Sequence, residues 1–250
     1  MKNRITFILT LSLLLFCAPQ AQVDSEAQTE TFTVNGVQFA MVFVEGGTYT
    51  MGATSEQGSD LWLDEKPAHS VSVSTFYIGE TEVTQALWQA VMDSNPSYFK
   101  GSQRPVEQVS WDDCQTFISK LNSITGMNFR LPTEEEWEYA ARGGNKFRHT
   151  KYSGSSEAGS VAWYDENSGK KTHDVKTKQP NELGIYDMSG NVSEWTSSYW
   201  RKDYSSSVDT RYRVDRGGSW HSCVRNVRVP CRSLNVSFSG IKFIGFRLAL

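Results

Sequence analysis

The sequence predicts a single α+β domain with little regular secondary structure, and three observations support that class. Two amphipathic helices with recognisable caps lie in the middle of the chain, and short strands precede them. After residue 145, aromatic residues, glycines and polar turns replace any helical period. Eight Trp, ten Tyr, thirteen Phe and nineteen Gly are typical of loops held by aromatic rings. A doubly wound sheet, a propeller and a helical bundle do not fit this order of elements.

The N-terminus carries the features of a secretory signal peptide. Lys2 and Arg4 precede an apolar run over residues 5–16, and small residues follow. We expect residues 1–22 to be removed on export, since the apolar run is too short for a transmembrane span. Cys17 stands where a lipid could be attached, but Phe16 is bulkier than the residue that usually precedes such a cysteine. We therefore expect an exported protein, periplasmic or at the cell surface, without a lipid anchor.

The first part of the mature chain is expected to contain short strands and loops. Residues 23–37 are polar and predict a flexible lead-in before a domain over residues 38–250. Residues 41–52 read as two short strands around a tight Gly-Gly turn, and alternation over residues 71–78 predicts another strand. Residues 53–68 are acidic and irregular, which indicates a loop.

A short helix and the two amphipathic helices are predicted between residues 84 and 144. Thr84 can cap a short helix that ends before Asn95-Pro96. Ser110 and Asp113 resemble a capping box at the start of a helix over residues 110–123, whose apolar residues share one face. After a short strand at residues 129–131, Thr133 and Glu136 provide a second capping box. Gly143-Gly144 then ends that helix.

Charge and cysteine content exclude one class of partner and suggest a disulfide. A net charge of −3 without a long basic run provides no electrostatic footprint for nucleic acid. Export would permit disulfides, and Cys114, Cys223 and Cys231 remain after removal of the signal peptide. We expect Cys223 to pair with Cys231 and Cys114 to be a buried apolar residue.

Seven segments carry recognisable motifs: residues 43–52, 82–84, 105–111, 130–142, Asn181 to Trp195 with Gly190-Asn191-Val192-Ser193-Glu194-Trp195, Arg216-Gly217-Gly218-Ser219-Trp220, and Gly245-Phe246-Arg247-Leu248. They resemble, in the same order, segments of the sulfatase-modifying-factor family, whose enzymes oxidise a cysteine to formylglycine. Seven segments in order make the chain resemble that family from residue 41 to its end. The resemblance implies the formylglycine-generating-enzyme fold, related to C-type lectins, with little regular secondary structure.

The resemblance also implies a structural calcium site. The family's enzymes bind calcium through side chains at the positions of Asp187 and Glu194 and carbonyls at those of Gly190 and Val192. Carboxylates and carbonyls suit a hard cation, and all four positions match. The alternative is a Gly-Asn turn whose acidic residues cap backbone amides. The four histidines are scattered, and no pair has ligand spacing for a transition metal.

Oxidase activity in the family depends on two cysteines about five residues apart, which hold copper as thiolates. The matching positions here are Val224 and Val229. Cys223 lies one residue from the first position, and Cys231 lies beyond the second. The resemblance therefore favours loss of the oxidase activity. The alternative is a copper-dependent formylglycine-generating oxidase in which Cys223 and Cys231 are the catalytic pair.

Residues 221–243 also resemble the variable region of a diversity-generating retroelement target, a class of protein that often has this lectin-like fold. Randomised Asn codons yield Ser, His, Cys, Leu, Val, Phe, Gly and Ile but never Glu, Gln, Met or Trp, and none of these last four occurs in the segment. Ligand binding would then use His221, Ser222, Cys223, Cys231, Ser233, Leu234, Asn235, Val236, Phe238 and Phe243. The alternative is that the apolar residues are core strand positions.

We therefore expect an exported, non-catalytic recognition module whose segment 221–243 binds a protein or glycan ligand at the cell envelope. The competing hypotheses are the formylglycine-generating oxidase and an envelope scaffold protein.

Overall fold

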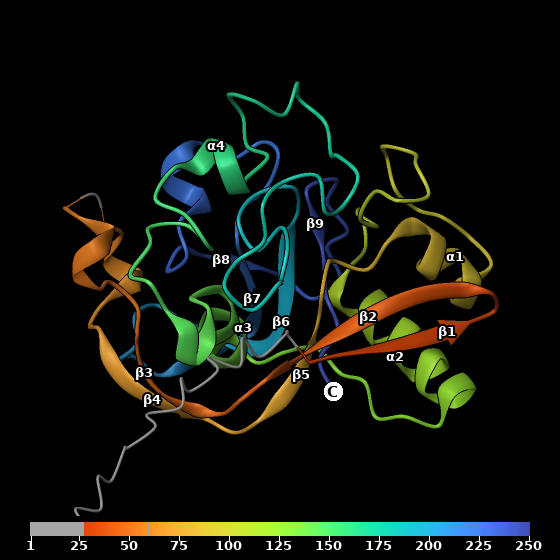
Figure 1. The fold of residues 1–250 in the computed structure, drawn as a ribbon, viewed down its shortest axis with the longest axis horizontal. Coiled ribbons are helices and arrows are strands. Elements are labelled where there is room, and N and C mark those ends of the chain that lie inside the picture. The colour runs from red at the N-terminus through yellow and green to blue at the C-terminus, as the bar shows by residue number, and fades with distance from the viewer. Residues whose placement is uncertain (1–27, 60) are drawn as a thin grey trace, which may run out of the picture.

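The computed structural model describes residues 28–59 and 61–250, so the predicted signal peptide and Cys17 lie outside the described residues. Nine strands form three sheets in this part of the chain (Figure 1). The sheets are β1 (Thr29–Val34), β2 (Val37–Val44) and β5 (Phe76–Gly79); β3 (Gly47–Met51) and β4 (His69–Val73); and β8 (Arg232–Asn235), β7 (Val208–Arg216), β6 (Ser193–Arg201) and β9 (Ile244–Gly245). This mixed α+β architecture confirms the predicted class.

Four α-helices and four 3₁₀ turns are interspersed with these strands. They are α1 (Gln85–Met92), α2 (Trp111–Thr125), α3 (Glu134–Ala141) and α4 (Ala158–Val161), with η1 (Ser55–Gln57), η2 (Leu63–Glu65), η3 (Gly144–Lys146) and η4 (Val224–Val227). The four-stranded sheet lies at the centre, with α1, α2 and the β1–β2 hairpin on one side and β3–β4 on the other (Figure 1). None of the helices in the described ranges is long and apolar enough to cross a membrane.

The helices confirm the capping predictions. Thr84 accepts a hydrogen bond from the Leu87 amide at the start of α1. Ser110 with Asp113 and Thr133 with Glu136 each form a complete capping box, at α2 and α3. These caps satisfy amides that have no partner inside the helix, which fixes where each helix begins.

The N-terminal strands differ from the prediction. Residues 29–34 form β1, where a flexible lead-in was expected, because Phe32 packs against Phe39 and Phe129 at ring-centroid distances of 5.5 and 5.2 Å. Asn35 and Gly36, both with positive φ, make the tight turn into β2.

The expected hairpin around Gly46-Gly47 is also wrong. Strand β2 pairs with β1 and β5, whereas β3 pairs with β4, so the two glycines carry the chain from one sheet to another. A Cβ atom at Gly46 would lie 2.6 Å from the Val73 carbonyl oxygen, which explains why the crossing uses glycine. The strand predicted over residues 71–78 is likewise split between β4 and β5.

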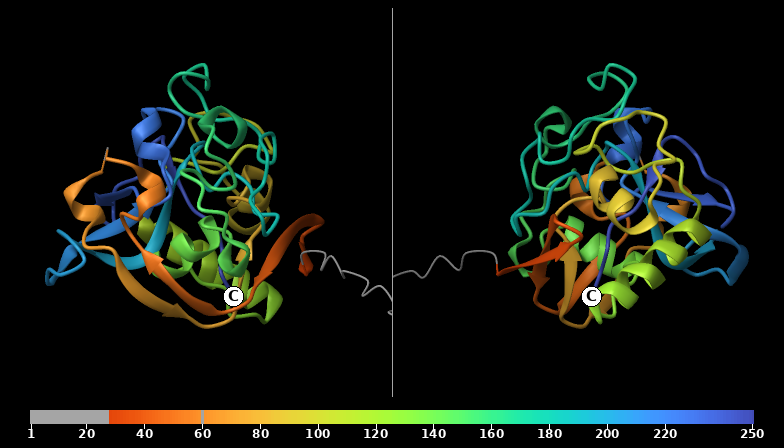
Figure 2. Two further views of the ribbon diagram at one scale, coloured as in Figure 1. Left: turned by 60° about the vertical axis from the view of Figure 1, so that its left-hand side comes forward. Right: turned by 90° about the vertical axis from the view of Figure 1, so that its right-hand side faces the viewer.

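The second half of the chain is more regular than predicted. Strands β6 and β7 form a hairpin with nine residues in each strand. Residues 129–131 form only a single bridge, from Arg130 to Ala249. The end of the chain lies beside β5, where Tyr77 and Leu250 exchange two backbone hydrogen bonds (Figure 2).

Two apolar clusters form most of the core. In the first, the rings of Trp88, Phe117 and Phe246 pack at centroid distances of 5.1 to 6.1 Å. The second lies under α3, around Trp137, and includes Val229. The core thus includes Ile244 of β9 and Val229 from the segment before β8. The residues between these two positions contribute less to the core.

Candidate functional site

The segment 221–243 begins at a turn that requires glycine. Gly217 and Gly218 both have positive φ, at 86° and 67°. A Cβ atom at Gly218 would lie 2.5 Å from the Asn226 carbonyl oxygen, and one at Gly217 would lie 3.0 Å from the Trp137 ring. The Gly-Gly pair of the Arg-Gly-Gly-Ser-Trp motif therefore allows β7 to turn sharply onto η4.

Most of the predicted binding residues of this segment reach the surface. Phe238 is 77% exposed and Leu234 39% exposed. The others divide as follows: His221, Cys223 and Ser233 are exposed; Ser222, Asn235, Val236 and Phe243 are half-buried; Cys231 is buried. Phe238 is therefore not a core strand position, and strand β8 covers only residues 232–235.

The backbone of this segment is held while several of its side chains are free. The Asp112 amide donates to the Ser237 carbonyl (3.3 Å), the Gln108 amide to that of Ile241 (3.1 Å), and the Ser193 amide to that of Phe243 (2.9 Å). Trp220 adds a bond from its indole nitrogen to the Lys242 carbonyl (3.2 Å). Backbone bonds of this kind do not depend on the side chains between them, so exposed positions such as Phe238 can vary without loss of the path. Gly240 is an exception, because a Cβ atom there would lie 2.9 Å from the Gln108 carbonyl oxygen.

Two arginines inside the segment point inward and anchor it. Arg228 forms two bonds with the Glu65 carboxylate, at 2.6 and 3.0 Å. Arg232 is bonded to Glu134 at 2.5 and 2.9 Å. Because all four side chains are buried, these pairs fix the segment from below and leave its outer face to the exposed residues.

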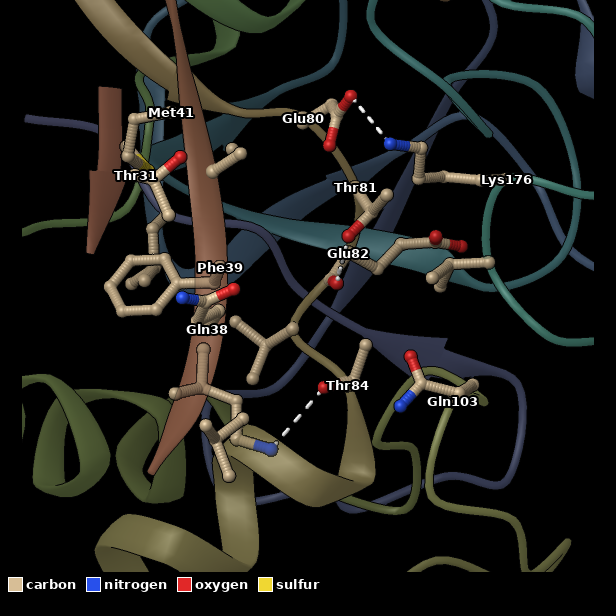
Figure 3. Close-up of a pocket in the computed structure, with 17 residues that line it drawn as sticks. Thr31, Gln38, Phe39, Met41, Glu80, Thr81, Glu82, Thr84, Gln103 and Lys176 are labelled. Atoms are coloured by element: carbon tan, nitrogen blue, oxygen red, sulfur yellow. Dashed lines mark hydrogen bonds and ion pairs between the residues drawn. The ribbon is translucent and has the colours of Figure 1, made fainter. Parts of the chain in front are cut away.

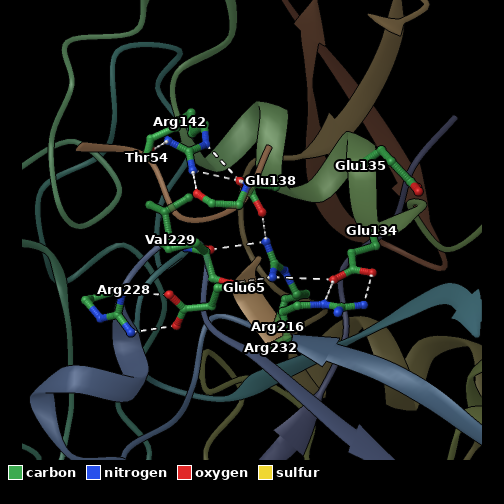
Figure 4. Close-up of polar contacts among 12 residues, drawn as sticks. Thr54, Glu65, Glu134, Glu135, Glu138, Arg142, Arg216, Arg228, Val229 and Arg232 are labelled. Atoms are coloured by element: carbon green, nitrogen blue, oxygen red, sulfur yellow. Dashed lines mark hydrogen bonds and ion pairs between the residues drawn. The ribbon is translucent and has the colours of Figure 1, made fainter. Parts of the chain in front are cut away.

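The two anchors belong to a larger buried network beneath the segment (Figure 4). Glu138 on α3 is bonded to both Arg142 and Arg216. Arg216 also donates to the Pro230 carbonyl (2.9 Å), and Arg142 reaches Glu56 (2.7 Å). Although burial alone would raise the pKa of Glu138, Arg142 and Arg216 outweigh it and hold that pKa below its usual value.

An aromatic group, only partly predicted from the sequence, borders the segment. Phe99 contacts Tyr98 and Trp220 edge to face, at centroid distances of 4.9 and 5.2 Å. His221 lies between Trp220 and Phe243, at 5.2 and 6.4 Å. Tyr98 is 62% exposed, so this aromatic group extends the candidate surface beyond residues 221–243. The Asn95-Pro96 turn after α1 places residues 98 and 99 there.

A second apolar edge comes from the start of η2 and the residue before it. Trp62 and Leu63 are both exposed, and Arg225 stacks over the Trp62 ring at 3.5 Å. The Trp62 indole donates to the Asn226 side chain (3.0 Å). Trp62, Leu63 and Asn226 line a hollow of about 400 Å³ that also contacts Cys231 and Ser233. The sequence identified this region only as a loop.

The cysteines do not form the predicted pair. Cys114, Cys223 and Cys231 all carry free thiols. Cys223 is exposed at the start of η4, whereas Cys231 is buried after it, so the two lie in different environments. Burial raises the pKa of the Cys231 thiol to about 12, and the nearby Glu65 carboxylate adds to the shift. A copper thiolate site needs the deprotonated form, which this environment disfavours.

The four predicted calcium ligands have unequal surroundings. Both oxygens of Glu194 accept bonds from Arg247, each at 2.6 Å, and Trp137 donates to one of them (2.7 Å). Asp187 accepts from the Lys176 amide through Oδ2 (2.9 Å), while its Oδ1 has no hydrogen-bond partner in the described part of the chain. Asp187 therefore fits a cation, whereas Arg247 competes for Glu194. No cluster of three or more His, Cys, Asp and Glu residues able to hold a metal ion occurs within residues 28–59 and 61–250.

Comparison with known proteins identifies relatives of the whole domain. Residues 26–250 match the family model described as "Sulfatase-modifying factor enzyme 1-like domain". A chaperone protein, LppX of Paenibacillus barcinonensis, is 35% identical over 239 residues, covering 76% of this chain and 81% of the relative. An inactive Cα-formylglycine-generating enzyme 2 from Bos taurus is 32% identical, with 67% of this chain and 57% of the relative covered.

Among solved structures, Treponema denticola variable protein 1 is similar with a TM-score of 0.79 and 33% identity. The match covers 88% of this chain and 98% of that protein. PvdO from Pseudomonas aeruginosa gives a TM-score of 0.73 at 25% identity, over 88% of this chain and 97% of that protein. These structures confirm the fold that the sequence motifs imply.

Proposed function

The chain belongs to the sulfatase-modifying factor family, and from that premise we propose that it is an exported, non-catalytic protein that binds a protein ligand at the cell envelope. The segment 221–243 forms the binding surface. Hydrogen bonds and buried ion pairs hold the backbone of the segment, and several of its side chains face solvent. A rigid backbone suits a recognition surface, because it lowers the entropy lost on binding.

One observation carries this proposal: the exposure of apolar side chains on a held backbone. Phe238 is 77% exposed, and Leu234 is 39% exposed on β8. A bulky apolar side chain in water lowers solubility, and such residues gather where another molecule covers them. The apolar character of both residues favours a protein ligand over a glycan.

The surroundings of the cysteines support a non-catalytic role. Val229, at a position where family oxidases carry a cysteine, is buried in the core under α3. Cys231 is buried with a raised thiol pKa. The similarity to an enzyme described as inactive is consistent with loss of the oxidase activity in this chain.

The segment 221–243 is further proposed to be a variable region diversified by a retroelement. The similarity to Treponema denticola variable protein 1 and the residue composition of the segment support this. A reverse-transcriptase gene beside this gene, with a near-copy of the segment, is the expected finding. A neighbourhood without either would contradict diversification and leave the binding proposal to be tested separately.

The binding surface can be tested with selected peptides. A displayed peptide library would be panned against the wild-type domain, and the affinity of the selected peptides measured for Phe238→Ser, Leu234→Ser and the control Ile124→Ser. Ile124 is 49% exposed on α2, outside the segment, so its substitution removes a similar apolar side chain elsewhere.

We expect Phe238→Ser to weaken binding roughly tenfold or more, as truncation of a central apolar contact does. Ile124→Ser should bind like the wild type. Equal binding by all variants would place the ligand elsewhere and contradict the proposal.

A further inference from the structure

Two hollows in the described part of the chain differ in their lining. The hollow between β2 and the segment that leads into α1, of about 320 Å³, contains the carboxylates of Glu80 and Glu82 and the ammonium of Lys176 (Figure 3). The hollow beside η2, of about 400 Å³, instead has the exposed side chains of Trp62 and Leu63. Exposed apolar side chains that gather at one place mark a surface that another molecule covers.

Three parts of the chain form the hollow beside η2. Residues 62–64 supply one part, residues of the segment 221–243 supply the second, and Lys202, in the turn between β6 and β7, supplies the third. Four of the eight lining residues belong to the segment, so the hollow is continuous with the proposed binding surface. Its volume lies within the range of ligand pockets, roughly 300 to 1,000 Å³.

The residues around this hollow are held in place by contacts with one another. The side-chain oxygen of Asn226 accepts a bond from the Trp62 indole (3.0 Å), and the Cys231 thiol lies 3.9 Å from the same oxygen. Arg225 stacks over the Trp62 ring at 3.5 Å and donates to the Leu61 carbonyl (2.9 Å). The Trp62 ring is therefore fixed although it is 40% exposed. A preformed wall lowers the entropy lost when a ligand enters.

Two lining residues with polar side chains contribute little net charge. The Arg232 guanidinium is bonded to Glu134 at 2.5 and 2.9 Å, and it also donates to the carbonyls of Asp64 (3.0 Å) and Arg201 (3.2 Å). Burial raises the pKa of the Cys231 thiol to about 12, so this thiol is protonated. A protonated buried thiol behaves as a small apolar group.

Lys202 supplies an exposed positive charge to the hollow. Its side chain faces solvent and forms no ion pair with any residue in the ranges 28–59 and 61–250. Asp64 also lines the hollow but is half-buried, and burial raises its pKa, although the nearby charge of Arg232 opposes the shift. A carboxylate on a ligand is therefore favoured beside the apolar wall, because the Lys202 ammonium attracts it.

We propose that this hollow binds one large apolar side chain of the protein ligand, and that an Asp or Glu beside it in the ligand pairs with Lys202. Trp62 and Leu63 cover the apolar side chain, as the walls of a pocket cover a buried anchor at an interface. This contact is part of the binding surface of the segment 221–243 and so rests on the function proposed for that segment. Because Leu63 and Lys202 lie outside the segment, their substitution tests the contact without altering residues 221–243.

Two displayed peptide libraries would be panned in parallel against the wild-type protein. Both carry a central Phe or Leu; one has Asp or Glu beside it, and the other has Lys or Arg. The affinity of an enriched peptide would then be measured for Leu63→Ser and Lys202→Glu. The matched controls are Ile124→Ser and Lys120→Glu, because both side chains are exposed on α2, outside the hollow.

We expect enrichment of the acidic library and not of the basic one. Leu63→Ser should weaken binding about fivefold or more, as removal of an apolar interface contact does. Lys202→Glu should weaken it about tenfold or more at low salt and less at high salt, because like charges then face each other. Both controls should bind like the wild type. Replacing the peptide's Asp or Glu by Lys should restore binding to Lys202→Glu.

A parallel measurement on Phe238→Ser separates this contact from the function proposed for the segment. If Phe238→Ser weakens binding while Leu63→Ser and Lys202→Glu bind like the wild type, the segment binds the peptide without the hollow and the contact is refuted. If only the two hollow variants weaken binding, the contact stands and the role of Phe238 fails. Equal enrichment of both libraries, or of neither, would also overturn the contact. Leu63 is 83% exposed, so Leu63→Ser should keep the wild-type melting temperature.

Discussion

Cys231 and Phe238 belong to the same C-terminal segment but have opposite environments. Cys231 is buried above Glu65 and Arg228, whereas Phe238 is 77% exposed. Both were predicted as ligand-binding residues, because composition alone does not separate an inward from an outward side chain. The inward set can be recognised once the buried arginines are known, since Arg228 and Arg232 fix which face of the segment points down.

The thiols give a prediction at the scale of single residues. At pH 8, under native conditions, we expect iodoacetamide to label Cys223 and not Cys114 or Cys231. Cys223 is exposed, while burial raises the pKa of both other thiols. Mass spectrometry of peptides would show one modification, lost in Cys223→Ser. A native protein with no labelled cysteine and an intact Cys223–Cys231 disulfide would contradict the free thiols.

Glu107 gives a prediction about how the stability of the fold changes with pH. Its carboxylate is buried and accepts a bond from the Phe99 amide (2.7 Å), while its other oxygen has no partner in the described chain. Burial raises the pKa of Glu107 to about 7, although amides of Phe99 and Tyr98 and the charge of Lys100 oppose the shift. The folded state therefore binds this proton more tightly than the unfolded state does.

The direction of this pH dependence follows from the difference in proton binding between the folded and unfolded states. Because its pKa is raised in the folded state, protonated Glu107 contributes to the free energy of unfolding. This contribution is fully present below the pKa of Glu107 in the unfolded state and is lost as pH rises through about 7. Between pH 4.5 and 8 the wild type should lose about 1 to 2 kcal/mol of unfolding free energy relative to Glu107→Gln, allowing for solvent screening. Urea denaturation at several pH values measures this loss of unfolding free energy. If the unfolding free energies of the two proteins change in parallel with pH, the pKa of Glu107 is not raised and the prediction is wrong.

At the scale of elements, the helices were predictable and the sheets were not. Helices α2 and α3 carry capping boxes that are local in sequence, so Ser110 and Thr133 could be identified without the fold. Strand pairing is non-local: nothing in residues 41–52 reveals that β2 pairs with β5 and β3 with β4. The β6–β7 hairpin was missed because its buried positions include Glu194, Asp215 and Arg216, which hide the alternation of apolar residues.

The turn and the strand at the two ends of the segment 221–243 could be predicted, whereas its neighbours could not. Gly217-Gly218 forms a turn and Ile244-Gly245 forms β9, at the anchors that the sequence indicated. The binding role of the segment stays a prediction. Tyr98, Phe99 and Trp62 could not be assigned to it, because loops far away in sequence bring them there.

At the scale of the whole molecule, buried ion pairs replace part of the regular secondary structure. Glu138 on α3 joins Arg142, whose partner Glu56 lies in η1, to Arg216 at the end of β7. Glu134 joins the same helix to Arg232 on β8. Elements that share no backbone ladder are thus connected through one helix, and their relative positions depend on charges without access to water.

The stability of the fold should therefore depend strongly on Glu138. Glu138→Ala leaves the buried guanidinium groups of Arg142 and Arg216 without a shared partner, and loss of one member of a buried pair costs about 3 to 5 kcal/mol. Asp209→Ala is the matched control, because its ion pair with Arg211 at 2.6 Å lies on the surface, where such pairs contribute at most about 1 kcal/mol. Urea denaturation of both variants compares the two losses. Similar small losses would mean that water reaches the network and that packing around Trp137, rather than the ion pairs, holds α3 in place.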